Sequence, residues 1–310
     1  MRQFMHSMRQ AAKTSPDQPP SSRPYLFPPS AQFGVDNLVL HARAKRHKVT
    51  DFAGPLSIKT VVEGRVVWKV DGRDLEVDSS SLLVLGDGQR YSMDVNVPAP
   101  VETACIFFRS GFVEAVAQDI TTPVEASLDD PQRVGPPLPY ILRLHVDSET
   151  SIIQRTQSLA RRCSEDLQPS GFEQDFLELS RDVLLIYDEV RRQMARVPAA
   201  KHSTREELLR RLERGREYIH SHAEGRLSLD DVAKAACLSR YHFHRLFSRV
   251  FQQTPHAYIT DIRMTRAYTL LLSGLSVNEV CEAVGFTSTS SFGRRFRARY
   301  QVAPGAVYKR

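Results

Sequence analysis

The spacing of hydrophobic residues changes along this chain, from alternation in the first third to helical periodicity beyond about residue 150. Between residues 31 and 110, short runs of alternating apolar and polar side chains are separated by turns, which is typical of β-strands. The clearest unit joins residues 65–70 to 73–77 through Asp71-Gly72, a dipeptide that favours a tight hairpin turn. Further strands are predicted at 81–85, 90–95 and 103–108, separated by Gly86-Asp87-Gly88 and Pro98-Ala99-Pro100. Many short strands with tight turns predict a small β-barrel.

Two long amphipathic helices are predicted after these strands. The apolar stripe of the first is Ile152, Ile153, Thr156, Leu159, Ala160, Cys163 and Leu167, and that of the second is Phe172, Phe176, Leu179, Val183, Ile186, Tyr187, Val190 and Met194. The second stripe advances by steps of three and four, which suits a helix-helix seam. This seam either packs against the barrel or joins two copies of the chain in a homodimer, and the residues leave both alternatives open.

A degenerate internal repeat occupies the last third of the chain. The segment Leu227–Ala233 returns as Leu275–Cys281, at an offset of 48. The pattern Phe-x-Arg-x-Phe at residues 243–247 returns at 292–296, at an offset of 49. One inserted residue therefore separates the paired elements in the second copy, and a turn tolerates such an insertion. The sequence predicts two copies of one small helical unit.

Each copy has the pattern of a helix-turn-helix. In the first copy, Ser228 is a suitable N-cap for a helix that ends near Cys237-Leu238, and Ser239 begins a second helix. In the second copy, Gly285 supplies the left-handed residue that such a turn requires. The inward faces of the two second helices are predicted to be Phe243, Leu246, Phe247 and Val250 in one and Phe292, Phe296 and Tyr300 in the other. A preceding helix is predicted to begin at a capping box, either Ser203 with Glu206 or Thr204 with Glu207, and to bury Leu208, Leu209, Leu212 and Ile219.

Charge distinguishes this helical region from an ordinary all-helical core. Residues 201–310 contain 19 lysine and arginine residues against 10 aspartate and glutamate residues, a net charge of +9. The whole chain carries +6, so the first 200 residues carry −3. No acidic residue follows Glu282, whereas Arg294, Arg295, Arg297 and Arg299 do. Such an asymmetric basic surface indicates a polyanionic partner, because neutralising phosphates releases counterions.

The segment Gly285–Arg297, followed by Pro304 and Tyr308-Lys309-Arg310, resembles the C-terminal motif of AraC/XylS-family transcription regulators. The resemblance covers about residues 205–310 and includes the upstream copy. It implies two helix-turn-helix units, joined by a helix over about residues 256–272, that enter adjacent major-groove segments of double-stranded DNA. It also implies a cupin-like effector-binding barrel in the N-terminal half, RNA polymerase as a partner, homodimerisation, and activation rather than repression.

The base-contacting positions of that family can be transferred through the repeat. The predicted DNA-binding set is Arg240, Tyr241, His244, Arg245 and Arg249 in the first unit, and Thr289, Ser290, Gly293, Arg294 and Arg297 in the second. Arg245 and Arg294 are the strongest candidates, because a guanidinium can donate two hydrogen bonds to guanine O6 and N7. The second unit offers short side chains at its other positions, so the downstream half-site is expected to depend on phosphate contacts and DNA shape.

A ligand inside the barrel would meet side chains that point inward. The candidates for an effector site are Trp68, Val70, Arg90, Tyr91 and Phe107, and the alternative is that they form an ordinary core. Metal cupins place a His-x-His and a glutamate on neighbouring strands, a pattern that this region lacks; its histidines are His41 and His47. The sequence therefore predicts no catalytic residue, no metal site and no cofactor. The remaining alternatives are a DNA-binding protein without an effector and a cupin enzyme with a helical appendage.

Length and composition set the domain organisation. A chain of 310 residues that is 41% hydrophobic can bury two ordinary cores. The expected order is a flexible proline-rich tail (1–30), a cupin-like sensor domain (31–148), a helical packing or dimerisation segment (149–197), a linker (198–204) and a double helix-turn-helix domain (205–310). The fold class is α+β. Four scattered cysteines and the absence of an apolar stretch near the start predict a cytoplasmic protein without a membrane span.

Overall fold

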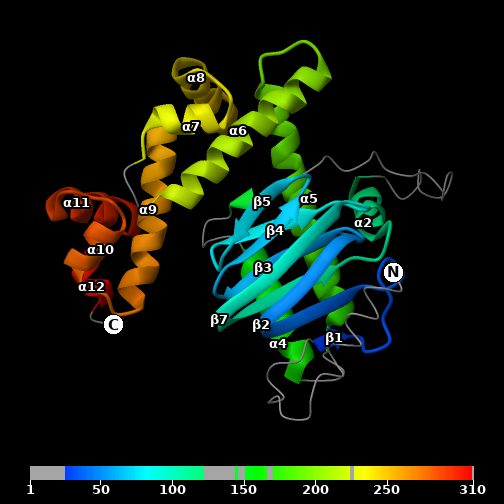
Figure 1. Cartoon of the computed structure of the whole chain (residues 1–310). Helices are drawn as coiled ribbons and strands as arrows, with labels where there is room; N and C mark the ends of the chain where they lie inside the picture. The colour runs from blue at the N-terminus through cyan, green and yellow to red at the C-terminus, as the bar shows by residue number, and fades with distance from the viewer. Residues whose placement is uncertain (1–24, 122–143, 146–150, 166–169, 224–226, 309–310) are drawn as a thin grey trace. The chain divides into compact units, whose positions relative to one another are not determined.

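The computed structural model describes residues 25–121, 144–145, 151–165, 170–223 and 227–308, which divide into two compact units at Val190/Arg191 (Figure 1). Unit 1 contains an antiparallel sheet with helices, and the described part of unit 2 is helical, which confirms the predicted α+β class. Residues 1–24 of the expected tail, and Leu167 of the first helical stripe, lie outside the described residues. Tyr25–Phe27, which were assigned to that tail, instead form strand β1.

The described strands of unit 1 form one antiparallel sheet. After β1 come β2 (Leu38–Ala53), β3 (Ser57–Glu63), β4 (Val66–Val70), β5 (Arg73–Val77), β6 (Ser81–Leu85), β7 (Arg90–Phe107) and β8 (Leu144–His145). Their order is β1-β2-β7-β3-β6-β8, and β4 pairs with both β7 and β5. The predicted hairpin is confirmed: Val70 pairs with Arg73, and both Asp71 and Gly72 have positive φ.

The long strands β2 and β7 bend this sheet into two layers. Their pairing register shifts between Ala44 and Arg46 and again between Val49 and Phe52. One half of β7 consequently pairs with β3 and the other half with β4. Apolar side chains from both halves form a single core. Among the described strands, β5 pairs with β4 alone and the order ends at β1 and β8, so the sheet does not close into the predicted barrel.

Pro98-Ala99-Pro100, which was expected to separate two strands, lies inside β7. Across the first register shift, Ala44 pairs with Val101 and Arg46 with Asn96, so residues 97–100 have no β2 partner in the ladder. A proline there removes no ladder hydrogen bond, because none is made at that position. The bulge therefore accommodates both prolines within one bent strand.

Helices cover the outer side of this sheet. They are α2 (Phe112–Thr121), which the sequence pattern did not predict, and the two expected helices, α4 (Ser151–Glu165) and α5 (Phe172–Arg196). The ring of Phe176 in α5 packs edge-on against Phe108 and Phe112. Gln157 Nε2 in α4 donates to the Val61 carbonyl of β3 at 3.1 Å. The apolar stripes of both helices are thus largely buried within their own chain, which is the packing alternative.

Unit 2 consists of seven described helices. These are α6 (His202–His222), α7 (Leu229–Ala235), α8 (Arg240–Phe251), α9 (Pro255–Leu272), α10 (Val277–Ala283), α11 (Thr289–Tyr300) and α12 (Pro304–Tyr308). Helix α9 matches the expected connecting helix and contacts elements of both helix pairs. Neither proposed capping box starts α6: the Arg205 N–H donates to the Lys201 carbonyl at 3.2 Å, so the helix begins one turn before Arg205 with Lys201 as its N-cap. There is no side-chain cap, because a lysine side chain has no acceptor atom.

Candidate nucleic-acid interface

The first helix-turn-helix, α7 and α8, has the predicted caps. The Ser228 hydroxyl accepts from the Asp231 N–H at 3.2 Å, and Ser239 caps α8 through the His242 N–H at 3.3 Å. Between the helices, Cys237 adopts φ 51°, and the Leu238 N–H donates to the Ala233 carbonyl at 2.9 Å. These bonds use carbonyl groups that the end of α7 would otherwise leave unpaired.

The second copy, α10 and α11, repeats this geometry. Ser276 and Glu279 form a complete capping box, and Ser288 caps α11. Gly285 has φ 73°, as predicted, and the Phe286 N–H donates to the Cys281 carbonyl at 3.0 Å. The left-handed position and its hydrogen bond recur at the offset of 48 that the sequence shows.

The two second helices also end alike. Gln252 and Gln301 both take the left-handed conformation, with φ 55° and 58°. The Nε2 of Gln252 donates to the Arg249 carbonyl at 2.6 Å, and the Nε2 of Gln301 donates to the Ala298 carbonyl at 3.1 Å. Identical start and end geometry places residues that are 49 apart at equivalent positions of α8 and α11.

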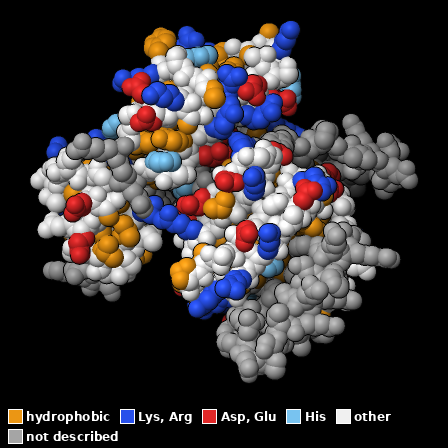
Figure 2. Space-filling view, viewed as in Figure 1, with side chains coloured by type: hydrophobic (Ala, Val, Ile, Leu, Met, Phe, Trp, Pro, Cys, Tyr) orange, Lys and Arg blue, Asp and Glu red, His pale blue; other side chains and the backbone are white. Residues whose placement is uncertain are grey.

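Burial of the inner faces leaves the candidate residues outside. The predicted apolar residues of α8 are fully buried, as are Phe292 and Phe296 of α11, while Tyr300 is half-buried. The remaining positions at helical spacing face solvent. All ten predicted DNA-binding residues are exposed except Gly293, which is half-buried. Basic and histidine side chains stand among the exposed groups of this unit in Figure 2.

Two arginines on the exposed face of α8 lie close to other side chains of unit 2. The guanidinium of Arg245 lies 5.8 Å from the centre of the Tyr241 ring, which is itself 76% exposed. Arg240 Nη1 lies 3.4 Å from Asp230 Oδ2, so a carboxylate shares its charge. Among the described residues, the arginines of α8 and α11 that form ion pairs are Arg240 and Arg299, which leaves the guanidinium forks of Arg245 and Arg294 available to an outside partner.

Other arginines of unit 2 have structural contacts. Arg299, which the charge pattern grouped with the exposed arginines, pairs with Asp261 at 3.0 Å and donates to Thr265 of α9 at 3.2 Å. Arg216 of α6 is buried and pairs with Glu213 at 3.0 Å. Burial alone would lower the pKa of Arg216, and Glu213 and Tyr258 raise it above its usual value. These arginines hold the unit together, and helical periodicity did not identify them.

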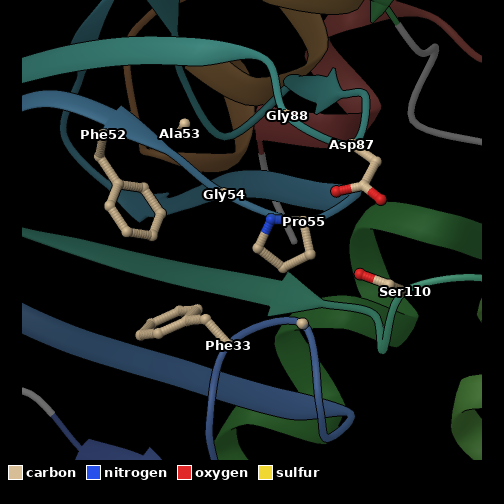
Figure 3. A pocket seen from close by; sticks show the side chains of 9 residues that line it. Phe33, Phe52, Ala53, Gly54, Pro55, Asp87, Gly88 and Ser110 are labelled. Atoms are coloured by element: carbon tan, nitrogen blue, oxygen red, sulfur yellow. The ribbon is translucent and has the colours of Figure 1, made fainter. Parts of the chain in front are cut away.

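The effector candidates of unit 1 separate into two groups. Trp68, Val70, Tyr91 and Phe107 lie in the buried core, whereas Arg90 is exposed and its Nε donates to Asp51 Oδ1 at 2.6 Å. A pocket of about 220 Å³ opens at one end of the sheet (Figure 3). It is lined by Phe33, Gly34, Phe52, Ala53, Gly54, Pro55, Asp87, Gly88 and Ser110.

The sequence reasoning missed Lys59, a buried lysine on the inner face of the sheet. Its neighbours in the strand are apolar or β-branched, and an apolar face with one lysine was the available signal. His41, considered as a metal ligand, lies 2.9 Å from Glu102. The described residues include no group of three or more histidine, cysteine, aspartate or glutamate side chains that could hold a metal ion. No helix in the described part of the chain has the length and apolar character needed to span a membrane.

Comparison with known proteins finds sequence relatives of the C-terminal unit. A family model described as a helix-turn-helix domain matches residues 232–310. The HTH-type transcriptional regulator YdeC of Bacillus subtilis is 39% identical over 88 residues, which cover 28% of this chain and 30% of YdeC. The TetD protein of transposon Tn10 from Escherichia coli is 35% identical over 94 residues, which cover 30% of this chain and 67% of TetD. An AraC-type regulator structure from Chromobacterium violaceum is 26% identical, covers 33% of this chain and 91% of its own, and has a TM-score of 0.31.

Two tandem helix-turn-helix units with exposed second helices define a class of DNA-binding fold. The chain belongs to the AraC/XylS family of transcriptional regulators. It spans only 28–32% of the length of the first curated relatives that it matches, YdeC, AlkR and PocR. The family is therefore established through the C-terminal unit.

Proposed function

We propose that this chain is a sequence-specific DNA-binding regulator of transcription. The supporting observation is that α8 and α11 bury equivalent faces and expose equivalent ones, on a unit with a net charge of +9 over residues 201–310. The proposed contact set is the ten residues named from the sequence. Helices of this size fit the major groove, and basic surroundings attract the phosphate backbone.

The two helices have different roles in this proposal. Arg245 and Arg294 each donate two hydrogen bonds to a guanine, and Tyr241 orients Arg245 beforehand. Around Arg294, the short side chains of Thr289 and Ser290 and the missing side chain of Gly293 reach few base edges. The α8 half-site is therefore the more selective one, and the α11 half-site depends more on phosphate contacts and DNA shape.

Unit 1 is proposed to be the sensor domain of this regulator, acting in the cytoplasm and without catalytic activity. Its enclosed core, its pocket and its helical cover suit a ligand-binding module. Activation through RNA polymerase and homodimerisation complete the proposal by analogy with the family. Turnover of a substrate by unit 1 would overturn the non-enzymatic assignment.

A competition gel shift with the DNA upstream of its own gene tests the central proposal. The full chain should retain the specific fragment against an excess of random DNA, and the logarithm of its affinity should fall linearly with the logarithm of salt concentration. Equal competition by both DNAs would instead identify a general DNA-binding protein. No retention of either DNA at low salt would reject DNA binding altogether.

A further inference from the structure

Lys59 is a buried amine that has no hydrogen-bonding partner. Its relative exposure is 1%, and its Nζ makes no hydrogen bond in the described structure. Lys59 lies in β3 between Leu83 of β6 and Cys105 of β7, both of which belong to the core. A lysine is almost never fully buried without a partner, because removing its charge from water is costly.

Aromatic rings surround this amine. Nζ lies 3.4 Å from the centre of the Phe107 ring and 4.9 Å from that of Tyr91. Ring faces attract a cation, but they have no lone pair that accepts a hydrogen bond as an oxygen atom does. The Phe107 and Tyr91 rings therefore tolerate the ammonium group without satisfying its three donors.

The pocket adjoins these rings through Phe33. The Phe33 ring lines the pocket and packs edge-on against Phe107, with ring centres 4.7 Å apart. It also packs edge-on against Phe52, at 5.5 Å, and Phe52 packs against Tyr91 in the same way. Figure 3 shows Phe33 and Phe52 together on one side of the pocket, with Asp87 and Ser110 on the other. Rotation of the half-buried Phe33 ring would extend the pocket toward the ring that holds Nζ.

We propose that the interior of unit 1 binds a small monocarboxylic acid with an apolar body, whose carboxylate pairs with Lys59 and whose body occupies the pocket that Phe33 and Phe52 line. The acid supplies the acceptor oxygens that the amine lacks, and the rings supply apolar contact. The pocket volume of about 220 Å³ restricts the ligand to a single ring or a short acyl chain. The regulatory consequence of this binding rests on the proposed function, but the binding itself does not.

The ionisation of Lys59 makes this binding dependent on pH. Burial lowers its pKa to about 7, and the titratable groups that face it from β7, Cys105 and Tyr91, have pKa values raised by burial and stay neutral. Leu83, its neighbour on β6, does not titrate, and Asp87 lines the pocket. A carboxylate requires the protonated amine, so affinity should fall at least about 10-fold between pH 6.5 and 8.5.

Calorimetric titration of the full chain with benzoate, phenylacetate, hexanoate and octanoate tests the proposal, with phenylacetamide as the uncharged counterpart of phenylacetate. At least one acid should bind at pH 6.5, and phenylacetamide should not. The variant Lys59→Met should lose the binding, and Lys69→Met, which removes an exposed lysine of β4, should retain it.

Saturable binding of none of the four acids at millimolar concentration overturns the proposal, as does equal binding of phenylacetate and phenylacetamide. Binding to the wild-type chain that does not change between pH 6.5 and 8.5 also overturns it, even if Lys59→Met fails to fold. The gel shift on the same preparation separates this result from the proposed function, because DNA binding without acid binding rejects only the ligand inference.

Discussion

At the scale of single residues, the two helix-turn-helix copies differ in the proposed base contacts and in the strain of the turn. Arg245 and Arg294 are exposed at equivalent places in the repeat, and among the described residues Arg245 alone of the two has an aromatic ring, that of Tyr241, beside its guanidinium. Cys237 and Gly285 likewise occupy equivalent turn positions, but only glycine adopts positive φ without steric cost. The two copies therefore share a backbone and differ in what individual side chains contribute.

Replacing Arg245 tests base recognition directly. Arg245→Ala should weaken binding to the specific site by about 1–3 kcal/mol, with a much smaller effect on random DNA, because it removes a two-bond contact to guanine. Fluorescence anisotropy on both DNAs measures this difference. Arg245→Lys keeps the charge but not the fork and should lose most of the same discrimination. Arg181→Ala, an exposed arginine of unit 1, is the charge-matched control; equal losses on both DNAs would refute base contact by Arg245.

A glycine in the turn between α7 and α8 should stabilise the protein. Cys237→Gly should raise the free energy of unfolding by about 0.5–1 kcal/mol, because φ 51° strains a residue with a Cβ atom. Denaturant unfolding measures the change. Cys237→Ala keeps the Cβ atom and should give no such gain. A similar gain from both variants would trace the effect to the thiol rather than to the backbone.

At the scale of elements, the helices of unit 2 are held together by a close approach of α6 to α8 and by an aromatic core around α11. A Cβ atom on Gly215 of α6 would lie 2.4 Å from Cε2 of Phe243 in α8, so these helices contact each other where no side chain fits. In the second copy, Phe292 and Phe296 of α11 pack with Met264 and Leu271 of α9. Because α9 contacts both helix pairs, it limits how each exposed face can move.

Two helix-interior glycines should respond oppositely to alanine. Gly215→Ala should lower the free energy of unfolding by about 1–3 kcal/mol through overpacking against Phe243. Gly293→Ala, with open space around the new methyl group, should raise it by about 0.5–1 kcal/mol through lower chain entropy. Thermal unfolding of the full chain compares them. Destabilisation by Gly293→Ala would contradict the open surroundings of that position.

At the scale of the whole molecule, the buried Lys59 lowers the free energy of unfolding of unit 1 at the place where we propose that the ligand binds. An apolar residue at position 59 would satisfy the core, whereas the lysine leaves three donors unpaired. Groups with strongly shifted pKa values concentrate at functional sites, because ligand binding requires polar side chains that a well-packed apolar core would not contain.

The free energy of unfolding should depend on pH because Lys59 is buried. The pKa of folded Lys59 is about 7, below its usual 10.5, so between these values the unfolded chain binds a proton that the folded chain does not. Stability therefore rises with pH in this window and carries the full penalty below it. Lys59→Met should gain on the order of 3–5 kcal/mol near pH 7, and the gain should shrink toward pH 10.5. Urea unfolding at pH 7, 8.5 and 10 measures it, and a gain that is constant with pH would contradict a neutral buried amine.

Local patterns in the sequence were sufficient to predict the helices and turns of the C-terminal unit. Caps, apolar stripes and turn residues act over a few positions, so Ser228, Ser239 and Gly285 could be assigned from their neighbours, and the repeat supplied the rest. The same repeat aligns Cys237 with Gly285 and could have identified the strained turn. Exposure of Arg245 followed from burial of the opposite helix face.

Contacts between distant segments decided the bulge in β7, the open sheet, and the burial of Arg299 and Lys59. The bulge that admits Pro98 and Pro100 into β7 depends on the register with β2, and closure of the sheet depends on pairing that β5 does not make. Arg299 is half-buried because Asp261 lies opposite it, and Lys59 is enclosed by rings from β7. Strand register and the enclosure of a side chain are set by partners far along the chain, which local periodicity does not encode.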